Sequence, residues 1–117
     1  MTKNFQAIIG DIGPYSAELR KLIPETMQGF TGMAKAATQP GVLDEKTKEL
    51  IALALGVASR CDGCLAYHAK SLVRLKATRE EVAEMLGMAI YMGGGPSLMY
   101  AADALRAYDE FASGSTG

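Results

Sequence analysis

Apolar residues recur at helical spacings of three and four along most of this 117-residue chain. No segment shows the alternation of apolar and polar residues that predicts a strand. The clearest helix is expected to begin after Asp44, a capping residue, and to end at Ala58. Its apolar residues lie on nearly every side, which predicts a buried helix. They are Leu50, Ile51, Leu53, Ala54, Leu55 and Val57.

Prolines mark the boundaries that we expect in the first third of the chain. Pro14 is expected to open a short helix, because its ring fixes a helical φ and the first turn does not need its missing N–H. Pro24 either begins a second helix or kinks the first. Helical sequence then continues to about Ala37 and ends before Pro40.

Two capping patterns predict the central helices. Ser59, followed three residues later by Asp62, resembles a capping box and predicts the start of a helix that runs through Leu75. Thr78 and Glu81 repeat this pattern and predict the start of the next helix.

The glycines at 93–95 are expected to end that helix. They follow a helix and lack the G-x-G-x-x-G spacing of a phosphate-binding loop. Pro96 is expected at the first position of a last helix, followed by a disordered tail over residues 112–117. The sequence therefore predicts an all-α fold of five to six helices in a single compact domain over residues 1–117.

The charge balance excludes some classes of partner. Lys and Arg number 12, Asp and Glu number 13, and the net charge is -1 with no basic run. Nucleic acid and anionic membrane surfaces are therefore poor candidates. The first residues lack the apolar core of a signal peptide, and no stretch is apolar enough to span a membrane. We expect a cytoplasmic protein, in which thiols stay reduced unless turnover oxidises them.

The candidate chemistry is concentrated in one segment, since both cysteines and the only histidine of the chain lie within eight residues. On a helix, Cys61, Cys64 and His68 share one face. This concentration predicts a thiol redox site, although a C-x-x-C pair can also be two small buried residues or half of a metal site. Cys61 in a first helical turn would be stabilised as a thiolate, and His68 could take the proton of Cys64. The residues alone do not select the attacking sulfur.

Glu49 becomes a candidate through the length of the predicted hairpin. It lies ten residues before the turn at Ser59, and His68 lies nine residues after it. Both would stand roughly 14 to 15 Å from the turn, so the carboxylate could reach the imidazole, fix its tautomer and raise its basicity. The alternative is that Glu49 belongs to a charged first turn that favours acidic residues electrostatically.

The spacing E-x11-C-x-x-C-x3-H resembles the signature of the alkylhydroperoxidase D (AhpD)-like branch of the carboxymuconolactone decarboxylase superfamily. The residues that carry it are Glu49, Cys61, Cys64 and His68. The resemblance covers residues 43–75 and extends to the following T-R-E-E-V. One departure is Gly63, at a position where well-known members often carry a second histidine before the second cysteine.

The resemblance implies an all-α fold and a thiol peroxidase activity. By it, Cys64 would be the peroxidatic sulfur, Cys61 the resolving thiol, and Glu49 with His68 a proton relay. The external reductant would be a lipoyl-type or thioredoxin-like dithiol. No haem, flavin or nucleotide signature is present, so we expect no cofactor. Whether the oxidant is hydrogen peroxide, an organic hydroperoxide or a protein disulfide stays open.

Two alternatives of other kinds remain. A zinc site built on the two thiolates and His68 would need Glu49, water or another subunit to complete it. A lactone decarboxylase, or a non-catalytic assembly protein of the same fold, would not depend on the cysteine pair.

We also expect a homo-oligomer, either a trimer or a hexamer. The helix of Leu50 to Val57 is apolar on most sides, and a chain of 117 residues offers limited interior to bury it together with the methionines at 85, 88 and 92.

Overall fold

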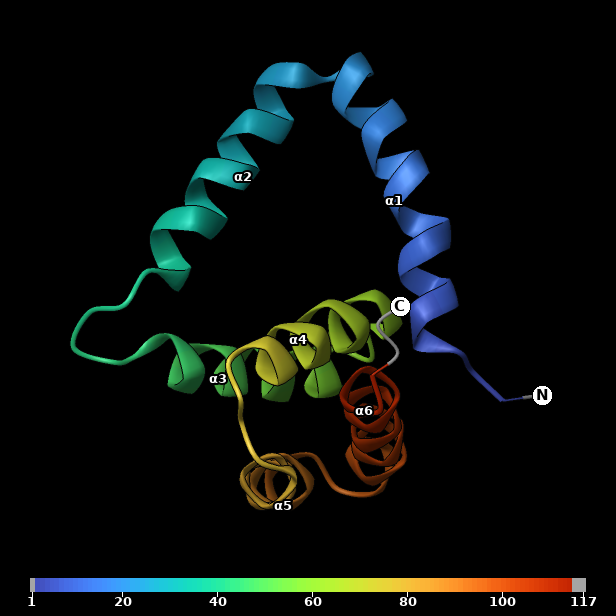
Figure 1. Ribbon diagram of the computed structural model, residues 1–117, viewed down its shortest axis with the longest axis vertical. Coiled ribbons are helices and arrows are strands. Elements are labelled where there is room, and N and C mark those ends of the chain that lie inside the picture. The colour runs from blue at the N-terminus through green and yellow to red at the C-terminus, as the bar shows by residue number, and fades with distance from the viewer. Residues whose placement is uncertain (1, 115–117) are drawn as a thin grey trace.

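Six α-helices make up most of residues 2–114, the part of the chain that the computed structural model describes, and no strand occurs among these residues. The helices, shown in Figure 1, are α1 (Phe5–Leu22), α2 (Pro24–Thr38), α3 (Glu45–Ala58), α4 (Asp62–Arg74), α5 (Arg79–Gly93) and α6 (Gly95–Ala112). The predicted all-α fold of five to six helices is confirmed. No helix in this part of the chain is long and apolar enough to cross a membrane.

The start of the first helix differs from the prediction. α1 begins at Phe5 rather than Pro14, because the Asn4 side chain accepts a hydrogen bond from the Ala7 N–H and supplies the cap. Phe5 is fully buried and anchors this end of the helix. Pro14 lies inside α1. Because proline has no N–H, the Gly10 carbonyl loses its helical hydrogen bond, and Gly10 is exposed to water.

The predicted cap at Ser59 is wrong. Ser59 ends α3, and Arg60 follows with a left-handed φ of 56°. The Cys61 N–H bonds the Gly56 carbonyl and the Arg60 N–H bonds the Val57 carbonyl, which is the pattern of a Schellman motif. This turn is so tight that Cys61 itself is the N-cap of α4.

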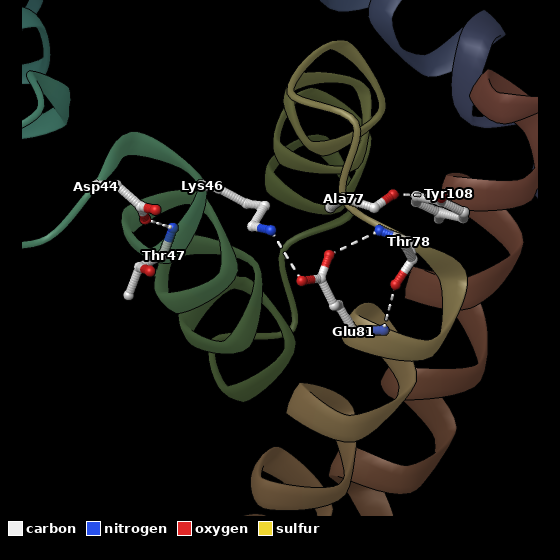
Figure 2. A network of polar contacts seen from close by, with 7 residues as sticks. All are labelled: Asp44, Lys46, Thr47, Ala77, Thr78, Glu81 and Tyr108. Atoms are coloured by element: carbon white, nitrogen blue, oxygen red, sulfur yellow. Dashed lines mark hydrogen bonds and ion pairs between the residues drawn. The ribbon is translucent and has the colours of Figure 1, made fainter.

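The caps at Asp44 and at Thr78 are confirmed. Asp44 accepts a hydrogen bond from the Thr47 N–H at 2.8 Å, and Thr78 and Glu81 form a reciprocal capping box (Figure 2). Glu81 also pairs with Lys46 at 2.8 Å and so ties α5 to α3. These contacts hold the pKa of the Glu81 carboxyl below its usual value, with the Lys46 hydrogen bond as the largest cause.

The core lies between α3, α4, α5 and α6, with the start of α1 closing one side. Its largest fully buried side chains are Phe5, Leu53, Leu65, Leu72, Val57 and Val82. α4 is central, because it packs against α1, α3 and α6. The Tyr108 hydroxyl donates a hydrogen bond of 2.6 Å to the Ala77 carbonyl, which joins α6 to the connection between α4 and α5 (Figure 2).

The N-terminal part of the chain departs from a single packed bundle. α1 packs against α4 and α6, and its later part and α2 rise away from the other helices as an arm (Figure 1). α2 has no buried residue. At the other end of the chain, the predicted disordered tail of 112–117 is wrong at Ala112, which belongs to α6. Ser113 and Gly114 form a turn, and residues 115–117 of the predicted tail lie outside the described part.

Candidate functional site

The hairpin of α3 and α4 brings Glu49 and His68 together. His68 Nδ1 lies 2.7 Å from Glu49 Oε1, so the carboxylate reaches the imidazole as the hairpin length predicts. Glu49 is buried, with 4% of its surface exposed, whereas 31% of the His68 side chain is exposed. The carboxylate therefore holds the ring from inside the protein while the ring itself reaches the surface.

This contact assigns the tautomer of His68. A carboxylate accepts hydrogen bonds, so Nδ1 carries the hydrogen and donates it to Glu49. The other ring nitrogen, Nε2, then has a free lone pair and can accept a proton. A buried carboxylate behind an imidazole is the arrangement that orients general-base histidines and stabilises the imidazolium formed during proton transfer.

Cys61 and Cys64 form a disulfide, so the structure represents the oxidised state of the pair. Their Cα atoms lie 5.2 Å apart. The Cys64 N–H donates to Cys61 Sγ at 3.1 Å, in the position that a capping oxygen would occupy. In the reduced protein, the same N–H at the positive end of α4 favours a thiolate on Cys61.

A glycine allows the two helices to approach closely at the sulfurs. A Cβ on Gly56 of α3 would lie 3.1 Å from the Cβ of Cys64, closer than most contacts of this kind. Sequence reasoning missed this residue, because a glycine inside an apolar helix carries no signal of what packs against it.

A pocket of about 260 Å³ opens beside the pair. Its lining residues are Cys64 and His68 of α4 with Ala52, Leu55, Gly56 and Ser59 of α3 and its end. Cys61 is not among them. A small molecule in this pocket would therefore lie against Cys64 and His68.

The first turn of α4 is covered by α1. A Cβ at Gly63 would lie 2.9 Å from Ile12 Cδ1, so a larger residue would force Ile12 to shift. The contact shows that Gly63 lies directly beneath Ile12 of α1.

A metal centre would need several ligand side chains close together at the site. Among residues 2–114, no group of three or more His, Cys, Asp and Glu side chains is arranged to hold a metal ion. Both sulfurs are engaged in the disulfide, and Glu49 is engaged by His68.

Known proteins show the same fold and a related sequence. The model of the carboxymuconolactone decarboxylase family matches residues 24–107. An uncharacterised protein of Cupriavidus necator is 43% identical over 109 residues, which cover 93% of this chain and 96% of that protein. The crystal structure of an apo carboxymuconolactone decarboxylase family protein from Legionella pneumophila superposes with a TM-score of 0.91 at 59% identity and covers 92% of this chain and 96% of that one.

A family protein from Thermotoga maritima, with a suggested involvement in antioxidative response, has a TM-score of 0.70 and 33% identity. It covers 75% of this chain, and the match spans 91% of its own. These matches are consistent with the resemblance to the AhpD-like branch, and the disulfide-bonded C-x-x-C pair is consistent with a redox function. By sequence and by fold, the chain belongs to the carboxymuconolactone decarboxylase family.

Proposed function

We propose that this protein is a thiol-dependent peroxidase that reduces hydroperoxides through a dithiol-disulfide cycle of Cys61 and Cys64. The observation that carries the proposal is the pocket that Cys64 and His68 line together, with buried Glu49 holding the imidazole from behind. The suggested antioxidative involvement of the Thermotoga maritima relative supports the same chemistry.

The first half of the cycle oxidises Cys64. His68 Nε2 takes the proton of the reduced Cys64 thiol, and the thiolate attacks the terminal oxygen of the hydroperoxide. A sulfur–oxygen bond forms, the oxygen–oxygen bond breaks, and the leaving alkoxide or hydroxide takes the proton from the His68 imidazolium. Glu49 stabilises that imidazolium while it exists. The products are a Cys64 sulfenic acid and an alcohol or water.

The second half forms the disulfide. The Cys61 thiol attacks the sulfenic sulfur, a sulfur–sulfur bond forms, and water leaves. The two Cα atoms are 5.2 Å apart in the oxidised state, within the usual range for a disulfide. Cys61 caps α4, and Cys64 lies in its first turn. Resolution therefore requires little movement of the backbone.

An external dithiol, of the lipoyl or thioredoxin-like type, then resets the pair. Its thiolate attacks the sulfur of Cys64, the cysteine that lines the pocket, and Cys61 leaves as a thiolate. Departure of Cys61 is favoured because the Cys64 N–H donates to its Sγ at 3.1 Å. A second attack by the partner dithiol releases Cys64, so that one disulfide is reduced and one is formed. The proposal includes a cytoplasmic location, where thiols are kept reduced between turnovers.

The proposal includes assembly into a homo-oligomer, a trimer or hexamer. A 15-residue helix with no buried residue, such as α2, gains little from its own subunit, and helices of this length are marginal alone in water. Phe30 and Met33 of α2 are 61% and 62% exposed. An apolar groove of about 540 Å³ also opens between α3 and α5. A stable monomer at micromolar concentration in light scattering would contradict this part of the proposal.

The test of the cycle is intact mass spectrometry after stoichiometric hydroperoxide. Reduced wild type is expected to lose two hydrogens and consume one equivalent of oxidant. The Cys61→Ser variant is expected to consume one equivalent and stop as a sulfenic acid, whereas Cys64→Ser is expected to consume none. The reverse pattern would exchange the roles of the sulfurs. Full and equal activity in both variants would eliminate the dithiol mechanism.

A further inference from the structure

Lys3, just before α1, connects the N-terminal segment to the start of α4. Its Nζ lies 2.9 Å from Asp62 Oδ1 and 2.8 Å from Asp103 Oδ2 of α6. It also lies 4.7 Å from the centroid of the Tyr100 ring. Asp62 is one of the two residues between the cysteines and the first residue of α4. The ammonium group is thus held at the helix end that carries the redox pair.

The position of Lys3 is fixed by its neighbours in the chain. Phe5 is fully buried, and its N–H donates to Glu110 Oε1 at 2.8 Å. Further along α1, Ile12 packs over Gly63. A lysine held by two carboxylates in such a network is less mobile than one in an isolated surface pair.

The charged groups around Lys3 have opposite effects on the ionisation of the two thiols. The Asp62 carboxylate, one residue from Cys61, disfavours a thiolate on either cysteine, and Asp103 adds a second negative charge. Lys3 offsets one of these two charges. Hydrogen bonds to Asp103 and then Asp62 hold the Lys3 pKa well above its ordinary value, so the ammonium stays charged wherever the thiols ionise.

We infer that Lys3 is a positioning residue for the dithiol: it neutralises Asp62 and thereby raises the thiolate population that the proposed cycle needs. The inference rests on the proposed peroxidase for its biological meaning. Its direct consequence, the ease of thiol ionisation, concerns the cysteine pair alone and can be measured without any peroxide.

Other charged groups near the pair must stay constant in the test. They are Arg60 beside Cys61, Glu49 and His68 of the hairpin, and exposed Asp11 beside Ile12 on α1. None of them lies between the two cysteines in the chain. The variants below leave all of them in place.

The experiment follows the rate of iodoacetamide alkylation of the reduced protein against pH, with Cys61→Ser and Cys64→Ser backgrounds isolating each sulfur. One unit charge several ångströms away in a largely aqueous setting changes an ionisation equilibrium by roughly threefold. Lys3→Met is therefore expected to raise the midpoint of the profile by about half a pH unit. Asp62→Asn should lower the midpoint by a similar amount, and the double variant should return it toward wild type.

Matched variants separate charge from structure. Lys3→Arg keeps the charge and should keep the wild-type midpoint, and Lys76→Gln, which removes an exposed lysine at the far end of α4, should also leave it unchanged. A purely structural Lys3 would lower the melting temperature in Lys3→Met without moving the midpoint, and that result would overturn the inference. So would a double variant whose midpoint stays as high as that of Lys3→Met alone. A wild-type protein inert to peroxide would refute the proposed function alone, because the alkylation profiles do not depend on it.

Discussion

Replacement of Glu49 by glutamine tests the relay most directly. In the wild type, His68 Nδ1 lies 2.7 Å from Glu49 Oε1. Glu49→Gln keeps the side-chain volume and an oxygen that can accept the Nδ1 hydrogen, so the tautomer of His68 is retained. Only the negative charge is removed. Because Glu49 is 4% exposed, water cannot replace that charge beside the imidazolium.

The size of the effect follows from the strength of this contact. A hydrogen bond to a charged group contributes about 1.5 to 3 kcal/mol, and about 1.4 kcal/mol corresponds to a factor of ten in rate. We therefore expect Glu49→Gln to slow the peroxide step roughly ten- to hundredfold at pH 7. At pH 9, above the free-thiol pKa of about 8.5, solvent can deprotonate Cys64 and the variant should approach the wild-type rate.

Stopped-flow measurement of peroxide consumption at pH 7 and pH 9, with a melting curve for each protein, provides the assay. Glu45→Gln is the matched control, since Glu45 lies in the first turn of the same helix and pairs with Arg74 at 2.9 Å. It should keep the wild-type rate. If Glu49 served only to stabilise the start of α3, its variant would melt at a lower temperature and react at the wild-type rate at pH 7, and this outcome would refute the relay.

Three further predictions concern stability. Gly94→Ala should lower the unfolding free energy by about 1 to 3 kcal/mol in chemical denaturation, because Gly94 has φ 74° and ψ -154°, a region open to glycine alone. Tyr108→Phe should lower the unfolding free energy by about 1 to 3 kcal/mol, because the Ala77 carbonyl loses its hydrogen-bond partner. Burial raises the Tyr108 pKa, so the wild type should also lose stability as the pH rises above about 10. A pH series of melting curves would reveal this loss. Hydrogen bonds lower the carboxyl pKa values of Asp44, Glu81 and Asp109. The melting temperature should therefore stay constant above about pH 4 and fall below it, as these groups are protonated. A melting temperature that does not change with pH would contradict these contacts.

Local sequence was sufficient where hydrogen bonds join residues a few positions apart. The caps at Asp44 and Thr78 depend on contacts to residues three positions later. The approach of Glu49 to His68 follows from the number of residues on each side of the turn and the rise of a helix. Whether these residues act as a relay, and which sulfur attacks, stay predictions.

Local sequence misled at Pro14 and at Ser59. Pro14 can lie within α1 because that face of the helix is open to water, and Asn4 with buried Phe5 starts the helix earlier. Ser59 was misplaced because the turn after α3 uses Arg60 in a left-handed conformation, where glycine is the usual residue. Nothing in the chain around Arg60 marks that conformation.

Periodicity, caps and the E-x11-C-x-x-C-x3-H spacing determined the fold class, the hairpin and the candidate residues, because each depends on interactions within one or two adjacent helices. The packing of distant segments decided the rest. Gly56 meets Cys64, Ile12 covers Gly63, and Lys3 binds a carboxylate 59 positions away. Such contacts leave no periodic or capping pattern in the chain, since they arise only when separate helices are brought together by burial of a shared core.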